Sequence, residues 1–335
     1  MLLLKTRGCE MVRYLRVLLS VVGLLVLQVN AQEFPNKMLS LVVPYPAGGP
    51  SDVVARKIQP DLMKSLGQNI IVENISGASG SLGVQRVISN GADGYTALMG
   101  TPMELVQAPL ALSAVKYKPE DMRLAGIVMN TNMVLVGRKN LPFNTVEELI
   151  AYAKNPKNKE LTYGSLGAGS MYHLVAERFK QLTKIEMLHV PYKGGAPLMQ
   201  DLLGEQIDLV FIPLAGNLPS LIESGQIKAF GITTASQHPN FPKIPTMSQV
   251  KGLKDFLFDI WIGIEVPRNT PEPAMIKWHQ AVANLKDAPD VRKAIEDMGG
   301  RQPQKMLNQA DLDKFYKQEI ARYQAIAKSI NLEAQ

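Results

Sequence analysis

The stretch Pro44-Tyr45-Pro46-Ala47-Gly48-Gly49-Pro50-Ser51-Asp52 joins an apolar run, residues 38–43, to a helix-like run that begins at Asp52. Glycine allows backbone geometry and close approach that a side chain would block. At the start of a helix, such a turn presents main-chain N–H groups that bind an anion without an arginine. The stretch therefore predicts a strand-to-helix turn of an α/β fold, and a place to hold a negatively charged group.

Three more glycine-rich turns follow the same plan of strand, turn and helix. They lie at residues 76–81, 164–170 and 192–197, and Lys193 is the only cation in the four turns. Four turns rich in N–H donors predict a cleft that holds a small carboxylate.

Apolar β-branched runs alternate with helical periodicity along the chain, which is typical of α/β units with parallel strands. Thr145 followed by Glu148 forms a capping box at a helix start. Two separate strands are expected at residues 124–129 and 133–136, on either side of Asn130-Thr131-Asn132. Further strands are expected at residues 38–43, 69–73, 95–99, 161–164, 187–191, 208–212, 228–233 and 259–266. Helices are expected at residues 52–66, 82–89, 145–154, 170–182, 196–203, 273–285, 290–298 and 311–330.

The domain organisation follows from length and from this alternation. With 335 residues the chain is too long for one comfortable core. We expect two α/β lobes, the first built from residues 32–133 and 258–335 and the second from residues 134–257. The ligand cleft lies at the carboxyl ends of the strands, and the hinge lies near residues 130–137 and 253–259.

Residues 1–31 are predicted to be a secretory signal peptide. Lys5, Arg7, Arg13 and Arg16 precede an apolar run, residues 17–29, and Val29-Asn30-Ala31 fits a cleavage site. The run is shorter than the roughly 20 residues that span a bilayer. The one cysteine, Cys9, lies in this segment, so the mature chain has no thiol chemistry, which suits an oxidising periplasm.

Charge and motif spacing exclude several function classes. Removal of residues 1–31 takes away four cations and one anion, so the net charge falls from +6 to about +3. No basic run supports nucleic-acid binding. No pair of histidines or acids has metal-ligand spacing. Gly167-x-Gly169 lacks the third glycine of a dinucleotide fingerprint, because residue 172 is tyrosine. We therefore expect no metal and no cofactor.

The candidate polar side chains have ordinary structural interpretations beside the functional ones. Asp52 can pair with Arg56 one helical turn later. His173 lies in the first turn of a helix, where a neutral ring that donates one N–H is expected. Ser170, His173 and Asp208 supply the side-chain types of a hydrolase, but no Gly-x-Ser-x-Gly elbow is present. A binding protein is therefore favoured over an enzyme.

Taken together, these motifs resemble the periplasmic solute receptors of tripartite tricarboxylate transporters, the Bug-type family. The resemblance is carried by residues 44–56, by Val72-Glu73-Asn74 with Gly77, Ala78, Gly80 and Gly83, by Asp93-Gly94-Tyr95-Thr96, by residues 190–197, and by Trp261-x-Gly263. It covers nearly all of the mature chain, with the motifs in order. Tyr45 stands where phenylalanine is common in the family.

The resemblance implies a type II periplasmic-binding-protein fold that closes on a carboxylate held by backbone amides of both lobes. The implied contacts are Tyr45, Ala47, Gly48, Gly49, Gly77 and Ala78 in the first lobe, and Ser165, Gly167, Ser170, His173, Gly194 and Ala196 in the second, with Asp208 as an acceptor for a ligand amine. Asp52, Gly169 and Gly195 complete the candidate set, because they lie in the same turns.

The resemblance leaves the partner open. The expected function is capture of a carboxylate-bearing metabolite and its delivery to the membrane permease subunits of such a transporter. The alternatives are a ligand sensor for a membrane histidine kinase, without a dedicated permease, and a hydrolase that uses Ser170, His173 and Asp208. We expect a monomer that binds no nucleic acid.

Overall fold

The structure is a computed structural model that describes residues 33–303, 307–330, 332 and 334. The predicted signal peptide lies outside the described residues. Lys37 begins a compact unit that extends to the end of the chain, and the description below concerns that unit alone.

Nine strands of this unit form a mixed sheet with the order β2-β1-β3-β9-β4-β7-β5-β6, and β8 pairs with β4. The strands are β1 Leu39–Val43, β2 Ile70–Asn74, β3 Thr96–Gly100, β4 Met122–Arg138, β5 Leu161–Ser165, β6 Met187–Pro191, β7 Leu209–Pro213, β8 Ile227–Ile232 and β9 Asp259–Pro267. The helices are α2 Pro50–Leu66, α3 Ser81–Ser89, α4 Ala108–Ala111, α5 Val146–Lys154, α6 Met171–Thr183, α7 Gly195–Leu203, α8 Leu218–Glu223, α9 Glu272–Asn284, α10 Pro289–Asp297 and α11 Gln309–Ser329.

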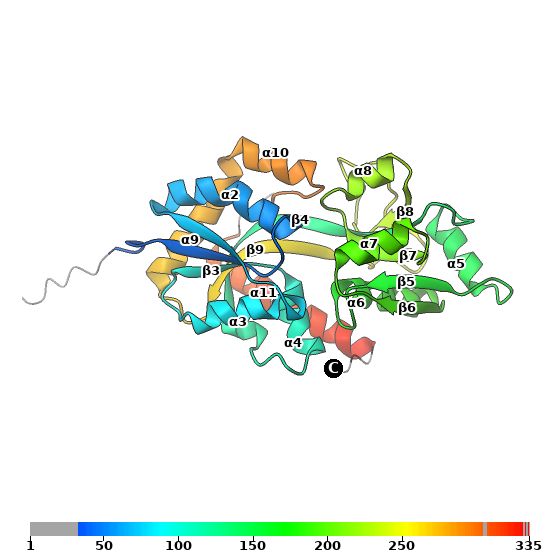
Figure 1. The fold of residues 1–335 in the computed structure, drawn as a ribbon, viewed down its shortest axis with the longest axis horizontal. Helices are drawn as coiled ribbons and strands as arrows, with labels where there is room; N and C mark the ends of the chain where they lie inside the picture. The colour runs from blue at the N-terminus through cyan, green and yellow to red at the C-terminus, as the bar shows by residue number, and fades with distance from the viewer. Residues whose placement is uncertain (1–32, 304–306, 331, 333, 335) are drawn as a thin grey trace, which may run out of the picture. The chain divides into compact units, whose positions relative to one another are not determined.

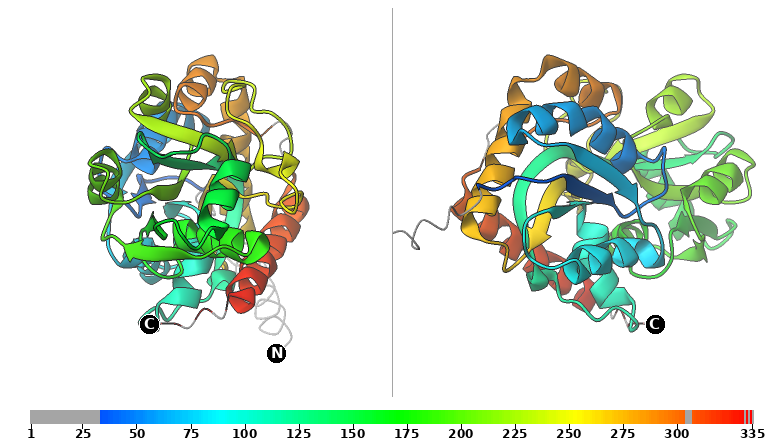
Figure 2. Two further views of the ribbon diagram at one scale, coloured as in Figure 1. Left: turned by 90° about the vertical axis from the view of Figure 1, so that its right-hand side faces the viewer. Right: turned by 60° about the vertical axis from the view of Figure 1, so that its left-hand side comes forward.

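The strands of each lobe are parallel at the outer edge of the sheet, as the alternation of strands and helices predicts. β1 pairs in parallel with β2 and β3, and β5 pairs in parallel with β6 and β7. β9 and β4 run antiparallel to their neighbours in the middle of the sheet. In the first lobe, α2, α9 and α10 cover one face of the sheet, and α3 and α11 cover the other (Figures 1 and 2).

The prediction of two short strands at residues 124–129 and 133–136 was wrong, because β4 runs unbroken through them. Two of the polar residues between them, Thr131 and Asn132, are buried, and their side chains are hydrogen-bonded. Thr131 Oγ1 donates to the carbonyl of Leu214 over 2.9 Å, and Arg301 Nη2 donates to Asn132 Oδ1 over 2.7 Å. Tertiary hydrogen bonds thus replace the solvent that these polar side chains would otherwise need.

β4 and β9 connect the two lobes. β4 pairs with β9 as far as Asn132 opposite Asp259, and from Met133 onward it pairs with β7 and β8 instead. The main chain therefore passes between the lobes in extended, hydrogen-bonded strands, and the two-lobe fold is built around them (Figure 1).

Candidate functional site

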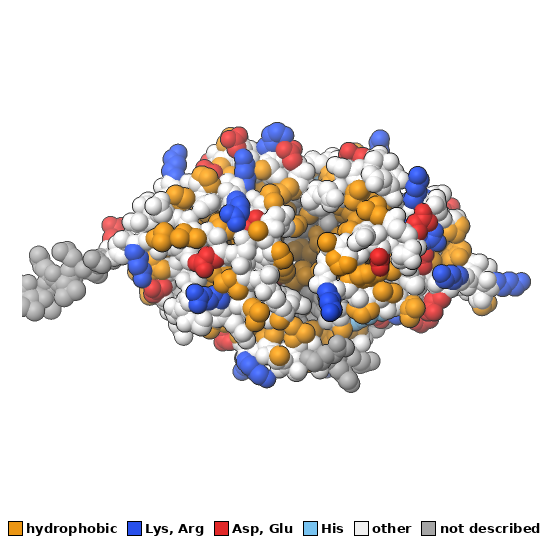
Figure 3. All heavy atoms as spheres, in the orientation of Figure 1, with side chains coloured by type: hydrophobic (Ala, Val, Ile, Leu, Met, Phe, Trp, Pro, Cys, Tyr) orange, Lys and Arg blue, Asp and Glu red, His pale blue; other side chains and the backbone are white. Residues whose placement is uncertain are grey.

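A cavity of about 400 Å³ lies between the two lobes. Its lining comprises residues 44–46 and 76–80, then Met103, Gln107, Ala108, Ala111 and Leu112, and on the second lobe Leu166, residues 168–170 and residues 193–195. Figure 3 shows this face of the molecule hollowed between the lobes, with hydrophobic side chains gathered along the hollow.

Seven of the sixteen predicted ligand-binding residues line this cavity. They are Tyr45, Gly77, Ala78, Gly169, Ser170, Gly194 and Gly195. The structure does not bring the other nine to its wall, namely Ala47, Gly48, Gly49, Asp52, Ser165, Gly167, His173, Ala196 and Asp208.

The turn after β2 presents free main-chain donors on the first-lobe side. Gly77 has φ 134°, and Ala78 and Ser79 have positive φ, so the chain folds back on itself before α3. The N–H of Gly80 donates to the carbonyl of Gly77 over 3.0 Å and closes the turn. Within the described part of the chain, the N–H groups of Gly77, Ala78 and Ser79 have no hydrogen-bond partner. These three amides are available to a ligand.

The start of α7 presents a second set of donors from the other lobe. Gly194 is the N-cap residue and makes no side-chain cap. The first N–H groups of a helix have no partner within the helix and carry its partial positive charge. Among the described residues, no acceptor bonds the amides of Gly194 and Gly195, and both residues line the cavity. Lys193, which is exposed, adds a cation at the same edge.

The first glycine turn uses the amides of Gly48 and Gly49 for hydrogen bonds within the turn, and neither residue lines the cavity. The N–H of Gly48 donates to Asp52 Oδ2 over 2.8 Å, and the N–H of Gly49 donates to the carbonyl of Pro46. The Asp52 carboxylate also pairs with Arg56 at 3.0 Å and accepts from Asn74. Asp52 thus stabilises this turn through its hydrogen bonds and does not line the cavity.

The third glycine turn is held by its own side chains. Ser165 is fully buried at the end of β5, and its Oγ accepts from the N–H of Gly167 over 3.0 Å. Ser170 Oγ donates to the carbonyl of Gly167 over 2.7 Å and caps α6 by accepting from the N–H of His173. Ser165, Gly167 and His173 support the turn from behind, while Ala168, Gly169 and Ser170 face the cavity.

His173 is neutral and stabilises this turn through its ring. Its Nδ1 accepts from the N–H of Gly169 over 3.2 Å, and its ring lies 4.6 Å from that of His189. Burial lowers the pKa of His173 and lowers that of His189 to about 4. His189 Nε2 lies 2.6 Å from Ser165 Oγ, so this second histidine also supports the turn. Neither ring supplies a positive charge to an anion.

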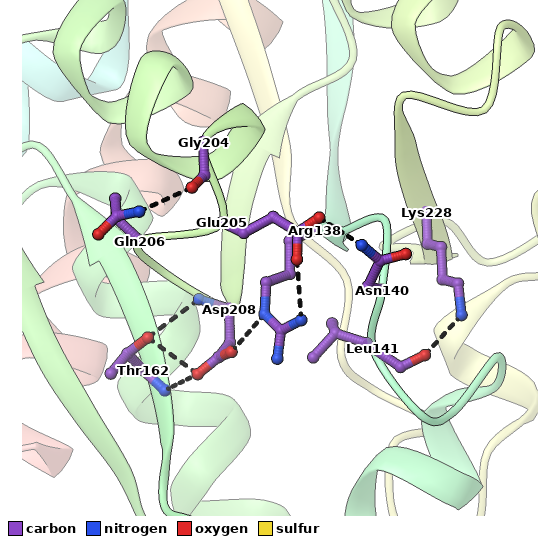
Figure 4. A network of polar contacts seen from close by, with 9 residues as sticks. All are labelled: Arg138, Asn140, Leu141, Thr162, Gly204, Glu205, Gln206, Asp208 and Lys228. Atoms are coloured by element: carbon purple, nitrogen blue, oxygen red, sulfur yellow. Dashed lines mark hydrogen bonds and ion pairs between the residues drawn. The ribbon is translucent and has the colours of Figure 1, made fainter.

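Asp208 lies at the far end of the strands from the cavity. Its carboxylate accepts from Arg138 Nε over 2.8 Å and from the N–H of Thr162 over 2.9 Å (Figure 4). Thr162 stands at the start of β5, whereas the cavity lies beyond its end. The expectation that Asp208 accepts a ligand amine is therefore corrected, because this carboxylate is already paired. Among the described residues, the side-chain hydrogen bonds of Asp208 are with Arg138 and Thr162, and not with Ser170 or His173 of the hydrolase alternative.

One wall of the cavity was not found from the sequence. A π-helical turn, Met103–Gln107, runs directly into α4. Together they supply four lining residues, and Leu112, directly after α4, is a fifth. A π-helical turn breaks the 3.6-residue period, so its apolar residues gave no helix signal. The usable signal was the short run of Met, Leu, Val and Ala after the third strand, with two buried polar residues, Glu104 and Gln107.

The described residues contain no group of three or more His, Cys, Asp or Glu side chains arranged to hold a metal ion. Within the same residues, every helix is too short or too polar to cross a bilayer.

The model of the tripartite tricarboxylate transporter family receptor matches residues 54–332. The chain belongs to this family. A relative from Agrobacterium vitis, described as the UPF0065 protein in the TAR-I ttuE-ttuC' intergenic region, is 33% identical over 92% of this chain and 89% of its own. The protein BugT of Bordetella pertussis is 29% identical over 84% of this chain and 88% of its own. The prediction of a Bug-type receptor is thus confirmed.

Solved structures confirm the two-lobe binding-protein fold. The periplasmic binding protein BugD matches with a TM-score of 0.78 and 30% identity over 90% of this chain and 100% of that chain. Rpa4515 of R. palustris, solved with adipate, has a TM-score of 0.80 and 30% identity over the same shares. MatC of Rhodopseudomonas palustris, solved with bound malate, has a TM-score of 0.76 and 29% identity over 88% of this chain and 99% of that one.

Proposed function

We propose that this receptor captures a small carboxylate in the cavity between its lobes, through main-chain amides of both lobes. The observation that carries the proposal is the pair of free donor sets, one at Gly77–Ser79 before α3 and one at Gly194–Gly195 before α7. Both sets belong to residues that line one cavity. The relatives solved with malate and with adipate support a carboxylate as the ligand class.

The energetic reason is that each N–H group donates to a charged acceptor. A hydrogen bond to a charged group contributes about 1.5–3 kcal/mol net, and a helix N-terminus adds about 0.3–1 kcal/mol. Loss of two such contacts lowers affinity at least about a hundredfold. Closure of the lobes brings both sets to one ligand, so a ligand stabilises the closed arrangement.

The test is a thermal-shift screen of the purified protein against a library of mono-, di- and tricarboxylates, followed by calorimetry on the compounds that shift the melting temperature. A ligand that binds only the folded protein raises that temperature. We expect at least one carboxylate to do so, and the matching amides or alcohols to have no effect. A library in which only uncharged compounds bind would refute the proposal.

We further propose that the chain is exported to the periplasm, is cleaved after Ala31 and acts as a monomer. In this proposal the first lobe comprises residues 32–133 and 258–335, and the second comprises residues 134–257. N-terminal sequencing of the protein from a periplasmic extract and light scattering on the purified protein test the cleavage site and the oligomeric state.

The partner is proposed to be the permease subunits of a tripartite tricarboxylate transporter, with a membrane sensor kinase as the alternative. Crosslinking in membranes, with and without ligand, distinguishes the two. We expect the permease subunits to be captured and the kinase not.

A further inference from the structure

The first-lobe wall of the cavity carries two polar side chains that offer acceptors rather than donors. One is Tyr45, which lines the cavity and whose hydroxyl donates to Glu104 Oε2 over 2.5 Å. A tyrosine hydroxyl has one proton. Because that proton is used on Glu104, the hydroxyl oxygen has only lone pairs left for a ligand.

The bonds around Glu104 fix this direction of donation. The Glu104 side chain is fully buried under the turn before α3, where a Cβ added to Gly80 would lie 2.9 Å from Glu104 Cβ. Oε1 accepts from the N–H of Thr101, which can only donate. Thr101 Oγ1 accepts from the N–H of Met103, so its own proton goes to Glu104 Oε2 over 2.7 Å. The carboxylate is therefore surrounded by donors, and Tyr45 is one of them.

The second acceptor is the side-chain carbonyl of Gln107. This residue is only 2% exposed and lines the cavity. Its Nε2 lies 3.5 Å from Met171 Sδ, and a thioether sulfur is an acceptor only, so the amino end of the amide points to Met171. The other end, Oε1, has no hydrogen-bond partner among the described residues. A buried carbonyl left unpaired is destabilising, and a ligand donor would remove that penalty.

We propose that the ligand carries, in addition to its carboxylate, a hydrogen-bond donor, either a hydroxyl or an ammonium group, that bonds to Tyr45 and Gln107. This inference rests on the proposed carboxylate-binding function and narrows its substrate class to hydroxy or amino acids. A second ligand carboxylate at this wall would place its oxygens against the Tyr45 and Gln107 oxygens, which also only accept. It would in addition be repelled by the Glu104 carboxylate, to which Tyr45 donates.

The experiment is calorimetry on matched acids of four and six carbons. For each length the panel holds the plain monocarboxylate, the dicarboxylate, and their 2-hydroxy, 2-amino, ω-hydroxy and ω-amino derivatives. Measurements are made at about pH 8, where Glu104 is mainly ionised, since burial raises the pKa of Glu104 to about 7. We expect a donor-bearing acid to bind at least about tenfold more tightly than both plain parents of the same length.

Two variants assign the effect to these side chains. Gln107→Leu removes the carbonyl at nearly constant volume, and Tyr45→Phe removes only the hydroxyl. Each is expected to reduce the preference for the donor-bearing acid at least about fivefold while the plain parents bind as before or more tightly. Gln226→Leu removes the same side-chain group at an exposed position outside the cavity lining, so it is the matched control and should leave the preference unchanged. Circular dichroism and melting temperature verify that each variant is folded.

The possible failures are distinguishable. If plain dicarboxylates bind as tightly as their donor-bearing forms, or if the preference survives in both Gln107→Leu and Tyr45→Phe, this inference is wrong while the carboxylate function stands. If no acid of the panel binds and the wider carboxylate library gives none either, the proposed function fails and this inference fails with it.

Discussion

In the proposed mode of binding, Gly194 leaves room for the ligand because glycine has no side chain. Its φ is 176°, an extended conformation open to any residue, and a Cβ added there would meet no atom within 4 Å. The space around it is the cavity itself. A bulky residue at this position therefore fits the fold but occupies ligand space, which separates an effect on binding from an effect on folding.

We predict that Gly194→Val raises the Kd for a carboxylate at least about a hundredfold. Glycine is a better N-cap than valine, so the free energy of unfolding should fall by only about 1 kcal/mol. Lys193→Ala is the companion variant. Loss of the Lys193 charge should raise Kd about tenfold or less, since an exposed charge is screened by solvent. Calorimetry and urea unfolding measure both effects. A larger loss of affinity in Lys193→Ala than in Gly194→Val would show that charge, and not the backbone, binds the ligand.

At residue scale, the sequence revealed which turns were rich in glycine but not which amides were free. Gly48 and Gly49 have the same local sequence signal as Gly194 and Gly195. The difference is that Asp52 and Pro46 accept the amides of the first pair. Such use of a donor inside its own turn depends on side-chain rotamers and turn closure, which residue type and spacing do not specify.

The π-helical turn Met103–Gln107 with α4 is the element that completes the cavity and links the lobes across it. Gln107 Nε2 contacts Met171 Sδ of the second lobe. A Cβ added to Gly169 would lie 2.0 Å from Cβ of Ala111 in α4. Gly169 therefore lets the third glycine turn approach α4 when the lobes are together.

We predict that Gly169→Ala weakens ligand binding at least about tenfold by holding α4 away from the third turn. Gly169 has φ 77°, so alanine also costs about 1–2 kcal/mol of backbone strain. Gly225→Ala is the matched control, because Gly225 has φ 68° and open space around it, outside the cavity lining. In urea, Gly169→Ala should lose at least as much unfolding free energy as Gly225→Ala, because both introduce backbone strain and only the first introduces an overlap with Ala111. Equal Kd values for the two would contradict the role of the contact with Ala111.

At element scale, the regular α/β units were predictable because each has its own apolar period. α2, α6 and α11, for example, begin and end within two residues of their predicted bounds. β4 was not, because Asn130, Thr131 and Asn132 interrupt the apolar pattern. The partners of the Thr131 and Asn132 side chains, namely Leu214, Asp259 and Arg301, are distant in sequence, and only the fold shows that these two side chains are hydrogen-bonded.

At the scale of the whole molecule, the pH dependence of the unfolding free energy is affected by carboxyl groups buried in the first lobe. Burial raises the pKa of Glu104 to about 7 and raises that of Glu265 well above its usual range. A carboxyl whose folded pKa is raised binds its proton more tightly in the folded state. Its stabilising contribution is full below the unfolded pKa and is lost as pH rises through the folded pKa.

We predict that wild type loses about 3 kcal/mol of unfolding free energy relative to Glu104→Gln between about pH 4.5 and pH 7. The comparison with the variant is needed because His189 and His238, whose pKa values burial lowers to about 4, change stability in the opposite direction over this window. Both histidines are present in both proteins, so their contributions cancel in the difference. Chemical unfolding of wild type and Glu104→Gln at several pH values measures the difference in unfolding free energy. A difference independent of pH would show that Glu104 does not titrate in this range.

In the proposed mode of binding, the two lobes, joined by β4 and β9, bring two sets of amides to one ligand. A crystal structure of the protein with a bound carboxylate tests this proposal most directly. We predict ligand oxygens within 2.7–3.2 Å of main-chain nitrogens in both Gly77–Ser79 and Gly194–Gly195. A carboxylate bound instead through Lys193 or other side chains, with those amides turned away from it, would contradict the proposed mode of binding.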